Sequence, residues 1–187
     1  MQINQAVILS GGQGERLRPF TKKTNKVMYP VGDKTFLWYL VKLLKDNGIN
    51  KILILTGWKA ETIKFDGVEF SYLPYPKKST LRLKKALPLL EDTFLLLYND
   101  NWWPLDLKEY ESLLYYYKDV IETRYKGKNI GFFIVNKKVI EKMPKVDKPV
   151  EHYLMKRANA VFNSSKPYLS ISDPERAEKT ANALQSM

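Results

Sequence analysis

The sequence predicts an α/β fold in which helices cover both faces of a mostly parallel central sheet, giving three layers. Two observations support this prediction. Short apolar runs such as residues 6–9 alternate with longer runs whose apolar residues recur at helical spacing, which is the strand, helix, strand order of a parallel sheet. Residues 51–56 carry an unbroken run of Ile and Leu, as expected of a strand that is covered on both faces.

The individual elements follow in order along the chain. We expect strands over residues 6–9, 51–56, 68–72, 94–98, 130–135 and 168–171. We expect helices over residues 36–44, 81–90, 107–120, 138–143 and 151–162. The first helix stops at Asn47-Gly48, and a last helix opens at Ser172-Asp173-Pro174-Glu175, where capping-box spacing is combined with an early proline.

The composition bounds the class of protein. With 187 residues, 44% of them hydrophobic, the chain is expected to form one domain over residues 1–187. The absence of cysteine excludes disulfide frameworks, thiolate nucleophiles and cysteine-ligated zinc, and it leaves the redox compartment open. No apolar run approaches the roughly 20 residues that span a bilayer, so we expect a soluble, cytoplasmic protein that binds no membrane.

The charge favours anionic partners. The formal net charge is +11, from 31 Lys and Arg against 20 Asp and Glu. The lysines occur as scattered pairs, with no basic tail and no recognisable nucleic-acid-binding motif, so we expect no nucleic-acid partner. Small phosphorylated molecules would match the charge equally well.

A glycine-rich loop follows the first apolar strand. Ser10-Gly11-Gly12-Gln13-Gly14-Glu15-Arg16 places three glycines where the backbone must turn and approach another group closely. Backbone amides in such a turn point at anions, and the guanidinium of Arg16 suits phosphate oxygens. The loop lacks the Gly-Lys-Ser/Thr of a Walker loop and, with Leu17, the third glycine of a dinucleotide fingerprint. It predicts phosphate binding, and a purely structural glycine turn is the alternative.

A longer pattern extends this loop. Leu17-Arg18-Pro19-Phe20-Thr21, Lys26 and Pro30-Val31-Gly32-Asp33-Lys34 follow it at fixed spacings, and the whole run closely resembles the signature of the sugar-phosphate nucleotidyltransferases. The resemblance implies a Rossmann-like nucleotidyltransferase fold, with a nucleotide-binding half over residues 1–107 and a shortened acceptor-binding half over residues 108–187. It also implies transfer of a nucleoside monophosphate from a nucleoside triphosphate to a sugar 1-phosphate, with release of pyrophosphate.

The same resemblance implies roles for individual residues. Arg16, Lys26 and Asp100 would be catalytic, and Asp100 would also bind a Mg²⁺ cofactor. Asn99-Asp100 resembles the Gly-Asp pair of the family and follows a buried strand, where parallel sheets bind ligands. The nucleotide would be bound by the glycine loop and by the segment after residue 78, through Leu9, Ser10, Gly11, Gly12, Gln13, Gly14, Ser79 and Thr80.

Later segments indicate the branch and the acceptor site. Residues 98–107 and 130–138 look most like the heptose- or hexose-1-phosphate guanylyl- and cytidylyltransferases of nucleotide-sugar synthesis for capsule or lipopolysaccharide, so GTP or CTP is favoured. Asn129 and Gly131 match an Asn-x-Gly that contacts the sugar in relatives, and Trp102 lies close to Asp100 in the sequence. These three are assigned to the acceptor. A homo-oligomer is left open.

Three departures from the family pattern leave a second function open. Ser79-Thr80-Leu81-Arg82-Leu83-Lys84 stands where the family carries glycines that accommodate the base. The acceptor segment is reduced to residues 122–128, and Ser170 replaces the usual second metal carboxylate, with Asp173 expected to cap a helix. The alternative to an active transferase is therefore a catalytically degenerate nucleotide-binding or interaction domain of the same fold.

Overall fold

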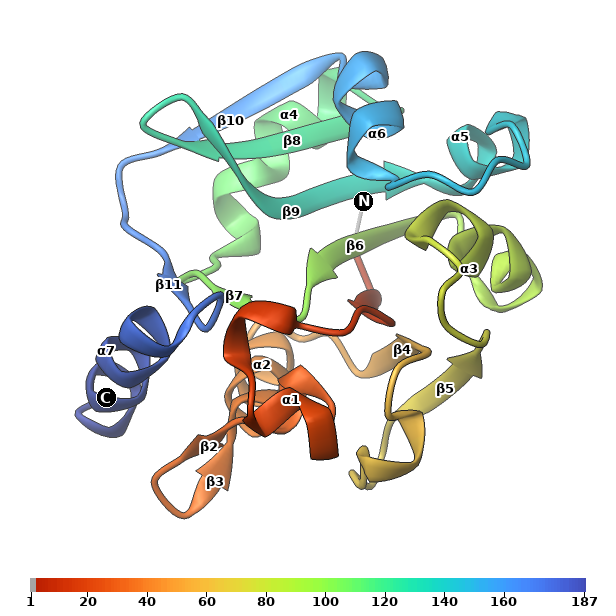
Figure 1. Cartoon of the computed structure of the whole chain (residues 1–187). Coiled ribbons are helices and arrows are strands. Elements are labelled where there is room, and N and C mark those ends of the chain that lie inside the picture. Colours follow the sequence, from red (N-terminus) through yellow and green to blue (C-terminus); the bar gives the residue numbers. More distant parts are fainter. Residues whose placement is uncertain (1–2) are drawn as a thin grey trace.

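A seven-stranded sheet forms the middle layer of the computed structural model, which describes residues 3–187 (Figure 1). Its strands lie in the order β10 (Ala160–Ser164), β8 (Val120–Tyr125), β9 (Lys128–Asn136), β6 (Thr93–Tyr98), β1 (Gln5–Ser10), β4 (Lys51–Thr56) and β5 (Glu69–Tyr72). Parallel pairs join β1 to β4 and β6, β4 to β5, and β8 to β10. Strand β9 runs antiparallel to both β6 and β8.

Helices and two short ladders complete the structure. The α-helices are α1 (Phe20–Lys23), α2 (Phe36–Asp46), α3 (Ser79–Lys85), α4 (Glu111–Tyr116), α5 (Lys137–Lys142), α6 (Glu151–Arg157) and α7 (Pro174–Gln185). Single 3-10 turns are η1 (Glu15–Leu17), η2 (Lys26–Met28), η3 (Ala60–Thr62), η4 (Leu87–Leu89) and η5 (Leu107–Tyr110). The antiparallel ladders pair β2 (Pro30–Val31) with β3 (Lys34–Thr35), and β7 (Asn101–Trp102) with β11 (Leu169–Ser170). Among residues 3–187, we find no helix with both the length and the apolar composition that a membrane crossing requires.

Each face of the sheet has its own apolar core. Successive residues of a strand point to opposite faces, so Ala6 and Ile8 pack in one cluster with side chains of α2 and α4. Val7 and Leu9 of the same strand belong to a second cluster, which includes side chains of α3, α5 and α6. Helices therefore cover both faces, and the expected three-layer, mostly parallel α/β fold is confirmed.

The helix ends follow from local hydrogen bonding. Helix α2 begins after Thr35, whose hydroxyl accepts a hydrogen bond from the Trp38 N–H at 3.3 Å. It ends at Asn47-Gly48 as expected, and Gly48 has a left-handed backbone with φ of 78°. Asp173 caps α7 by accepting a hydrogen bond from the Arg176 N–H at 3.0 Å, which confirms the expected start of the last helix.

For two of the expected helices, the prediction is wrong over the second half of the helix. The helix expected over residues 107–120 ends at Tyr116, and Val120 already begins β8. The helix expected over residues 151–162 ends at Arg157 and is followed by β10. Asn159 lies at this change, where its N–H donates to the Val120 carbonyl at 3.1 Å and its side chain accepts from the Val120 N–H at 3.2 Å. These bonds start the pairing of β10 with β8.

The reduced acceptor segment is a β-hairpin. Residues 122–128 form the end of β8, a two-residue turn and the start of β9. Lys126 and Gly127 both have positive φ, 49° and 76°, which is the backbone of the tight turn favoured between antiparallel strands. The hairpin adds two strands to the sheet beside β6 (Figure 1).

Candidate active site

A cleft of about 470 Å³ opens at the carboxyl ends of the parallel strands β1 and β6. Open parallel sheets bind ligands at this edge, and the volume lies in the range of small-molecule sites. The lining comes from the end of β1 and the glycine loop, from residues 75–79 before and at the start of α3, and from residues 98–100. Arg82 of α3, together with Pro149 and Glu151 at the start of α6, completes it. The structure thus brings together seven of the predicted site residues, Leu9, Gly11, Gly12, Gln13, Gly14, Ser79 and Asp100.

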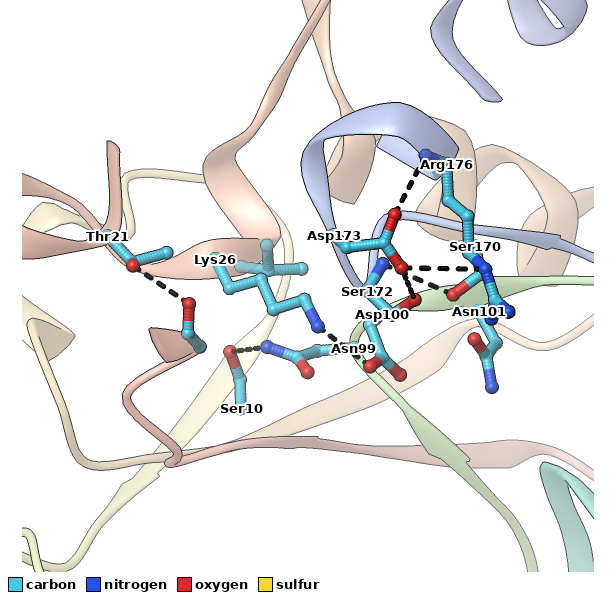
Figure 2. Close-up of polar contacts among 12 residues, drawn as sticks. Ser10, Thr21, Lys26, Asn99, Asp100, Asn101, Ser170, Ser172, Asp173 and Arg176 are labelled. Atoms are coloured by element: carbon cyan, nitrogen blue, oxygen red, sulfur yellow. Dashed lines mark hydrogen bonds and ion pairs between the residues drawn. The ribbon is translucent and has the colours of Figure 1, made fainter. Parts of the chain in front are cut away.

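Lys26 and Asp100 form an ion pair beside this cleft (Figure 2). The Lys26 Nζ lies 2.8 Å from Asp100 Oδ2, and the two side chains are 8% and 22% exposed. Lys26 begins the η2 turn, which Asn25 caps by accepting a hydrogen bond from the Val27 N–H. Because the pair is largely buried, salt screens it less than a surface pair. Among residues 3–187, Asp100 Oδ1 accepts no hydrogen bond and is left available.

Sequence reasoning missed two asparagines that hold the strand ends together. Asn99 Nδ2 donates to Ser10 Oγ at 3.0 Å, and Ser10 Oγ donates to Asn25 Oδ1 at 2.8 Å. Asn25 Nδ2 also contacts the carbonyl oxygens of Ser10 and Trp58 at 3.0 and 2.7 Å. The hydroxyl of Ser10, a predicted nucleotide-binding residue, is therefore engaged within the protein. Their position in the sequence could have indicated this role, since Asn25 directly precedes Lys26 and Asn99 directly precedes Asp100.

The three glycines of the loop have different surroundings. A β-carbon at Gly11 would collide with the Arg82 guanidinium, whereas one at Gly12 would meet no atom within 4 Å. Gly14 has a left-handed backbone with φ of 60°, and its carbonyl accepts from the Thr21 hydroxyl at 2.9 Å. The close approach expected at the glycines is thus, at Gly11, an approach to the Arg82 side chain of the protein itself. Only Gly12 combines open space with a place in the cleft lining.

The amides of this loop are open to a ligand. Within residues 3–187, the N–H groups of Gly12, Gln13 and Gly14 donate no hydrogen bond. Successive free amides make a concavity that binds anions. Arg16 lies on η1 just after them and is exposed, outside the cleft lining itself.

Ser79 and Thr80 open α3 at the edge of the cleft. The Ser79 hydroxyl accepts a hydrogen bond from the Val150 N–H at 2.8 Å. Thr80 is buried, and its hydroxyl contacts the carbonyl oxygens of Val146 and Lys148. Both hydroxyls hold the segment before α6 against α3, and Thr80 does not line the cleft.

The three residues assigned to the acceptor do not line the cleft either. Asn129 Nδ2 donates to Glu122 Oε1 at 2.9 Å, and Asn129 Oδ1 accepts from the Gly131 N–H at 2.8 Å. Gly131 has φ of 77°, and the ring of Tyr98 lies where its β-carbon would stand. Trp102 lines two other surface hollows beside α2. Asn129 and Gly131 thus adjoin the cleft through Tyr98, and Trp102 lies outside it.

The predicted metal position has a single carboxylate. Strand β11 lies beside Asp100, because the Ile171 N–H donates to the Asp100 carbonyl at 2.8 Å. The Ser170 hydroxyl accepts from the Ser172 N–H at 3.2 Å, and Asp173 is engaged as the α7 cap (Figure 2). Within residues 3–187, no group of three or more His, Cys, Asp or Glu side chains could hold a metal. Asp100 could hold a Mg²⁺ ion only if phosphate oxygens and water supplied its other ligands.

Tyr98 and Glu151 line the cleft but were not predicted. The Tyr98 hydroxyl is buried and has no hydrogen-bond partner among residues 3–187. Burial, and next the negative charge of Glu151, raise the pKa of the Tyr98 phenol, which stays neutral. Its place just before Asn99-Asp100 was an available signal. Glu151 reaches the cleft only through the fold.

Known proteins match this chain in sequence and in structure. The Nucleotidyl transferase family model matches residues 5–69. D-glycero-alpha-D-manno-heptose 1-phosphate guanylyltransferase of Campylobacter jejuni is 31% identical over 113 residues, which are 56% of this chain and 51% of that protein. Choline-phosphate cytidylyltransferase of Streptococcus pneumoniae is 40% identical over 68 residues, 36% of this chain and 29% of that protein. The chain thus spans about half the length of the first relative and less of the second.

The structural match is more extensive. HddC from Yersinia pseudotuberculosis superposes with a TM-score of 0.81 at 23% identity, over 97% of this chain and 100% of HddC. This likeness shows a shared fold. In its sequence signature this chain is similar to the nucleotidyltransferases that act on phosphorylated sugars, and it shares the fold of HddC.

Proposed function

We propose that this protein transfers a nucleoside monophosphate from a nucleoside triphosphate to a sugar 1-phosphate, or to a similar small phosphorylated acceptor, and releases pyrophosphate. The observation that carries the proposal is the Lys26–Asp100 pair, which lies beside the open amides of Gly12, Gln13 and Gly14. A cation, a carboxylate and free amide donors at one sheet edge suit a polyphosphate and its counter-ion.

The reaction needs alignment and charge neutralisation more than proton transfer. An acceptor phosphate oxygen attacks the α-phosphorus in line, the bond to the β-phosphate bridging oxygen breaks, and pyrophosphate leaves with that electron pair. The loop amides would hold the triphosphate, and the Lys26 ammonium would neutralise charge at the α-phosphate. Arg16 would meet the outer phosphates from the rim. A Mg²⁺ ion bound by Asp100 and the phosphate oxygens would supply further charge neutralisation.

The proposed base and acceptor are supported by two of the relatives, although other relatives are uridylyl- and thymidylyltransferases. The two curated proteins described above are a guanylyltransferase and a cytidylyltransferase, which supports GTP or CTP as the donor. One is named for a heptose 1-phosphate and the other for choline phosphate, so the acceptor class includes sugar and non-sugar phosphates. Residues 108–187, with Asn129, Gly131 and Trp102, are assigned to the acceptor on the resemblance.

Two measurements test this proposal. Thermal unfolding is followed with CTP, GTP, UTP, dTTP or ATP plus Mg²⁺, and pyrophosphate release is then measured with a panel of sugar and non-sugar phosphates. We expect GTP or CTP to raise the Tm and pyrophosphate to appear only with an acceptor. A protein that no triphosphate stabilises would contradict the proposal at its first step.

The second candidate function is a nucleotide-binding domain without turnover. It is favoured by the single carboxylate at the metal position, where Ser170 carries only a hydroxyl that is already hydrogen-bonded. The same measurements separate the two functions. Stabilisation by a triphosphate, with no pyrophosphate release for any acceptor, would establish the binding domain.

A further inference from the structure

Arg82 is buried beneath the glycine loop and was not assigned a role by the sequence. It lies in α3 and is 3% exposed. Its guanidinium donates to the carbonyl oxygens at the ends of three neighbouring strands and in the loop that follows β5, namely those of Gly11, Thr56, Leu73, Pro74 and Lys77. One side chain therefore joins the segments after β1, β4 and β5.

The glycines next to Arg82 are explained by this side chain. A β-carbon at Gly11 or at Gly57 would overlap the guanidinium, so neither position accepts a side chain while Arg82 is in place. The guanidinium thus fits against two strand ends at van der Waals contact. Arg82 lies in the segment where the family carries glycines, and its bulk is matched here by small residues on the facing loops.

The charge of Arg82 has no carboxylate partner within ion-pair distance among residues 3–187. Burial lowers the pKa of its guanidinium, and Tyr72 and the more distant charge of Asp147 offset this only in part. The direct partners of the guanidinium are carbonyl oxygens. Burying a cation in this way is costly compared with an apolar residue of similar size. General stability is therefore a poor explanation for an arginine at this position.

The contact with Gly11 fixes the orientation of one peptide group. The Gly11 carbonyl accepts from Arg82 at 3.4 Å and from the Trp58 N–H at 3.2 Å, so it points into the protein. In a planar trans peptide the N–H points opposite to the carbonyl oxygen. The N–H of Gly12 therefore points away from these donors, on the exposed side of a residue that lines the cleft.

We propose that Arg82 is a positioning residue for the nucleotide site, whose guanidinium turns the Gly11–Gly12 peptide so that the Gly12 amide faces the bound nucleotide. The inference rests on the proposed function. It assigns the role to the planar fork of donors and not to charge alone, because one ammonium group cannot reach three strand ends at once.

The experiment compares Arg82→Lys and Arg82→Ala with Lys85→Met. Lys85 is a matched control, since it is in the same helix and donates to the Tyr72 carbonyl at 2.6 Å but is exposed. GTP and CTP affinity is measured by calorimetry in Mg²⁺, and the Gly12 amide is followed by NMR in the free protein. Arg82→Ala is measured with and without millimolar methylguanidine, which can fill the vacated site.

We expect both Arg82 variants to lose triphosphate affinity by about tenfold or more, the effect of one hydrogen bond to a charged group. Methylguanidine should restore part of the affinity of Arg82→Ala and leave the wild type unchanged. The Gly12 amide signal should move in Arg82→Lys and stay in place in Lys85→Met. If Arg82→Ala does not fold, Arg82→Lys carries the test, because it keeps the charge and most of the volume.

Two results would overturn the inference and can be told apart. If the wild type binds triphosphate and a folded Arg82 variant binds it equally well, Arg82 does not position the loop. If the wild type binds no triphosphate, the proposed function itself has failed. An affinity loss that Arg82→Lys fully repairs would also overturn the inference, because charge would then suffice without the fork.

Discussion

The glycine loop of residues 10–16 and the β8–β9 hairpin are built alike but use their backbone donors in opposite ways. In the loop, Gly11 lies against Arg82 of α3, and Asn25 bonds the backbone of Ser10. In the hairpin, Gly131 lies against Tyr98 of β6, and Asn129 bonds the backbone of Gly131. In the loop, the amides of Gly12, Gln13 and Gly14 have no partner among residues 3–187. In the hairpin, the Gly131 N–H is bonded to Asn129.

The hairpin pairs the buried carboxylate of Glu122 with its own donors, although Arg124 Nε is buried and has no hydrogen-bond partner among residues 3–187. Glu122 is fully buried and accepts hydrogen bonds from Arg124 at 2.8 Å and from Asn129 at 2.9 Å. Buried charges are tolerated when they are paired in this way. The comparison teaches that two motifs matched to the same family differ here: the loop leaves three amide donors free among residues 3–187, whereas the hairpin uses the Gly131 and Asn129 donors within its own backbone and side chains.

The largest expected effect is the loss of turnover on removing the Asp100 charge. Asp100→Asn should lower the rate of pyrophosphate release by about 100- to 1,000-fold, because the cation at the reacting phosphates loses its protein ligand. Asp46→Asn is the matched control, since Asp46 is also paired with a lysine, at 2.7 Å, but on the exposed face of α2. Full turnover in Asp100→Asn would refute the metal assignment.

Gly131→Ala tests the hairpin. Alanine at φ of 77°, with its β-carbon 2.7 Å from the Tyr98 ring, should lower the free energy of unfolding by about 2–4 kcal/mol. Urea unfolding measures this loss. At a temperature where the variant is folded, its triphosphate affinity should match the wild type. A stable variant with reduced turnover would instead place Gly131 in the acceptor site.

Gly12→Ala is the counterpart in the loop. Because a β-carbon there meets no atom within 4 Å, the free energy of unfolding should change by less than about 0.5 kcal/mol. The methyl group would stand on the cleft lining, and triphosphate affinity should fall about tenfold as the phosphate loses one amide hydrogen bond. If Gly12→Ala instead lowered the free energy of unfolding and kept its triphosphate affinity, the loop glycine would serve folding and not ligand binding.

The central strands β1, β4 and β6 were predictable because they are buried and apolar over most of their length. The errors fall where short strands follow helices. In residues 151–162, the apolar positions fit helical spacing, and the hydrogen bonds of Asn159 to Val120 are visible only once β8 is recognised. Apolar spacing alone does not separate a short strand from a helix end.

The placement of the candidate site was predictable where its residues belong to short local patterns at or after strand ends, even though Asp100 is 74 residues from Lys26 along the chain. The glycine loop, Lys26 and Asp100 come together as expected. Arg82 and Glu151 reach the cleft through the packing of α3 and α6, which no local pattern describes. Arg82 was recognised only as a departure from the family's glycines, although the structure gives it the most contacts with the strand ends.

The smallest expected effect concerns Asp173, at the N-terminus of α7. The hydrogen bond from the Arg176 N–H holds the Asp173 pKa below its usual value of 3.8, and the Ser172 hydroxyl, the charge of Arg176 and, least of all, the charge of Arg16 lower it further. A lowered folded-state pKa contributes stability that is present above pH 3.8 and is lost as the pH falls through the folded-state value. Asp173→Asn keeps a capping oxygen but has no charge to titrate. Its Tm should lie at most a few degrees below the wild type at neutral pH, and the difference should vanish in acid. A difference that persists at low pH would show that the carboxylate stabilises α7 through its shape and not through its charge.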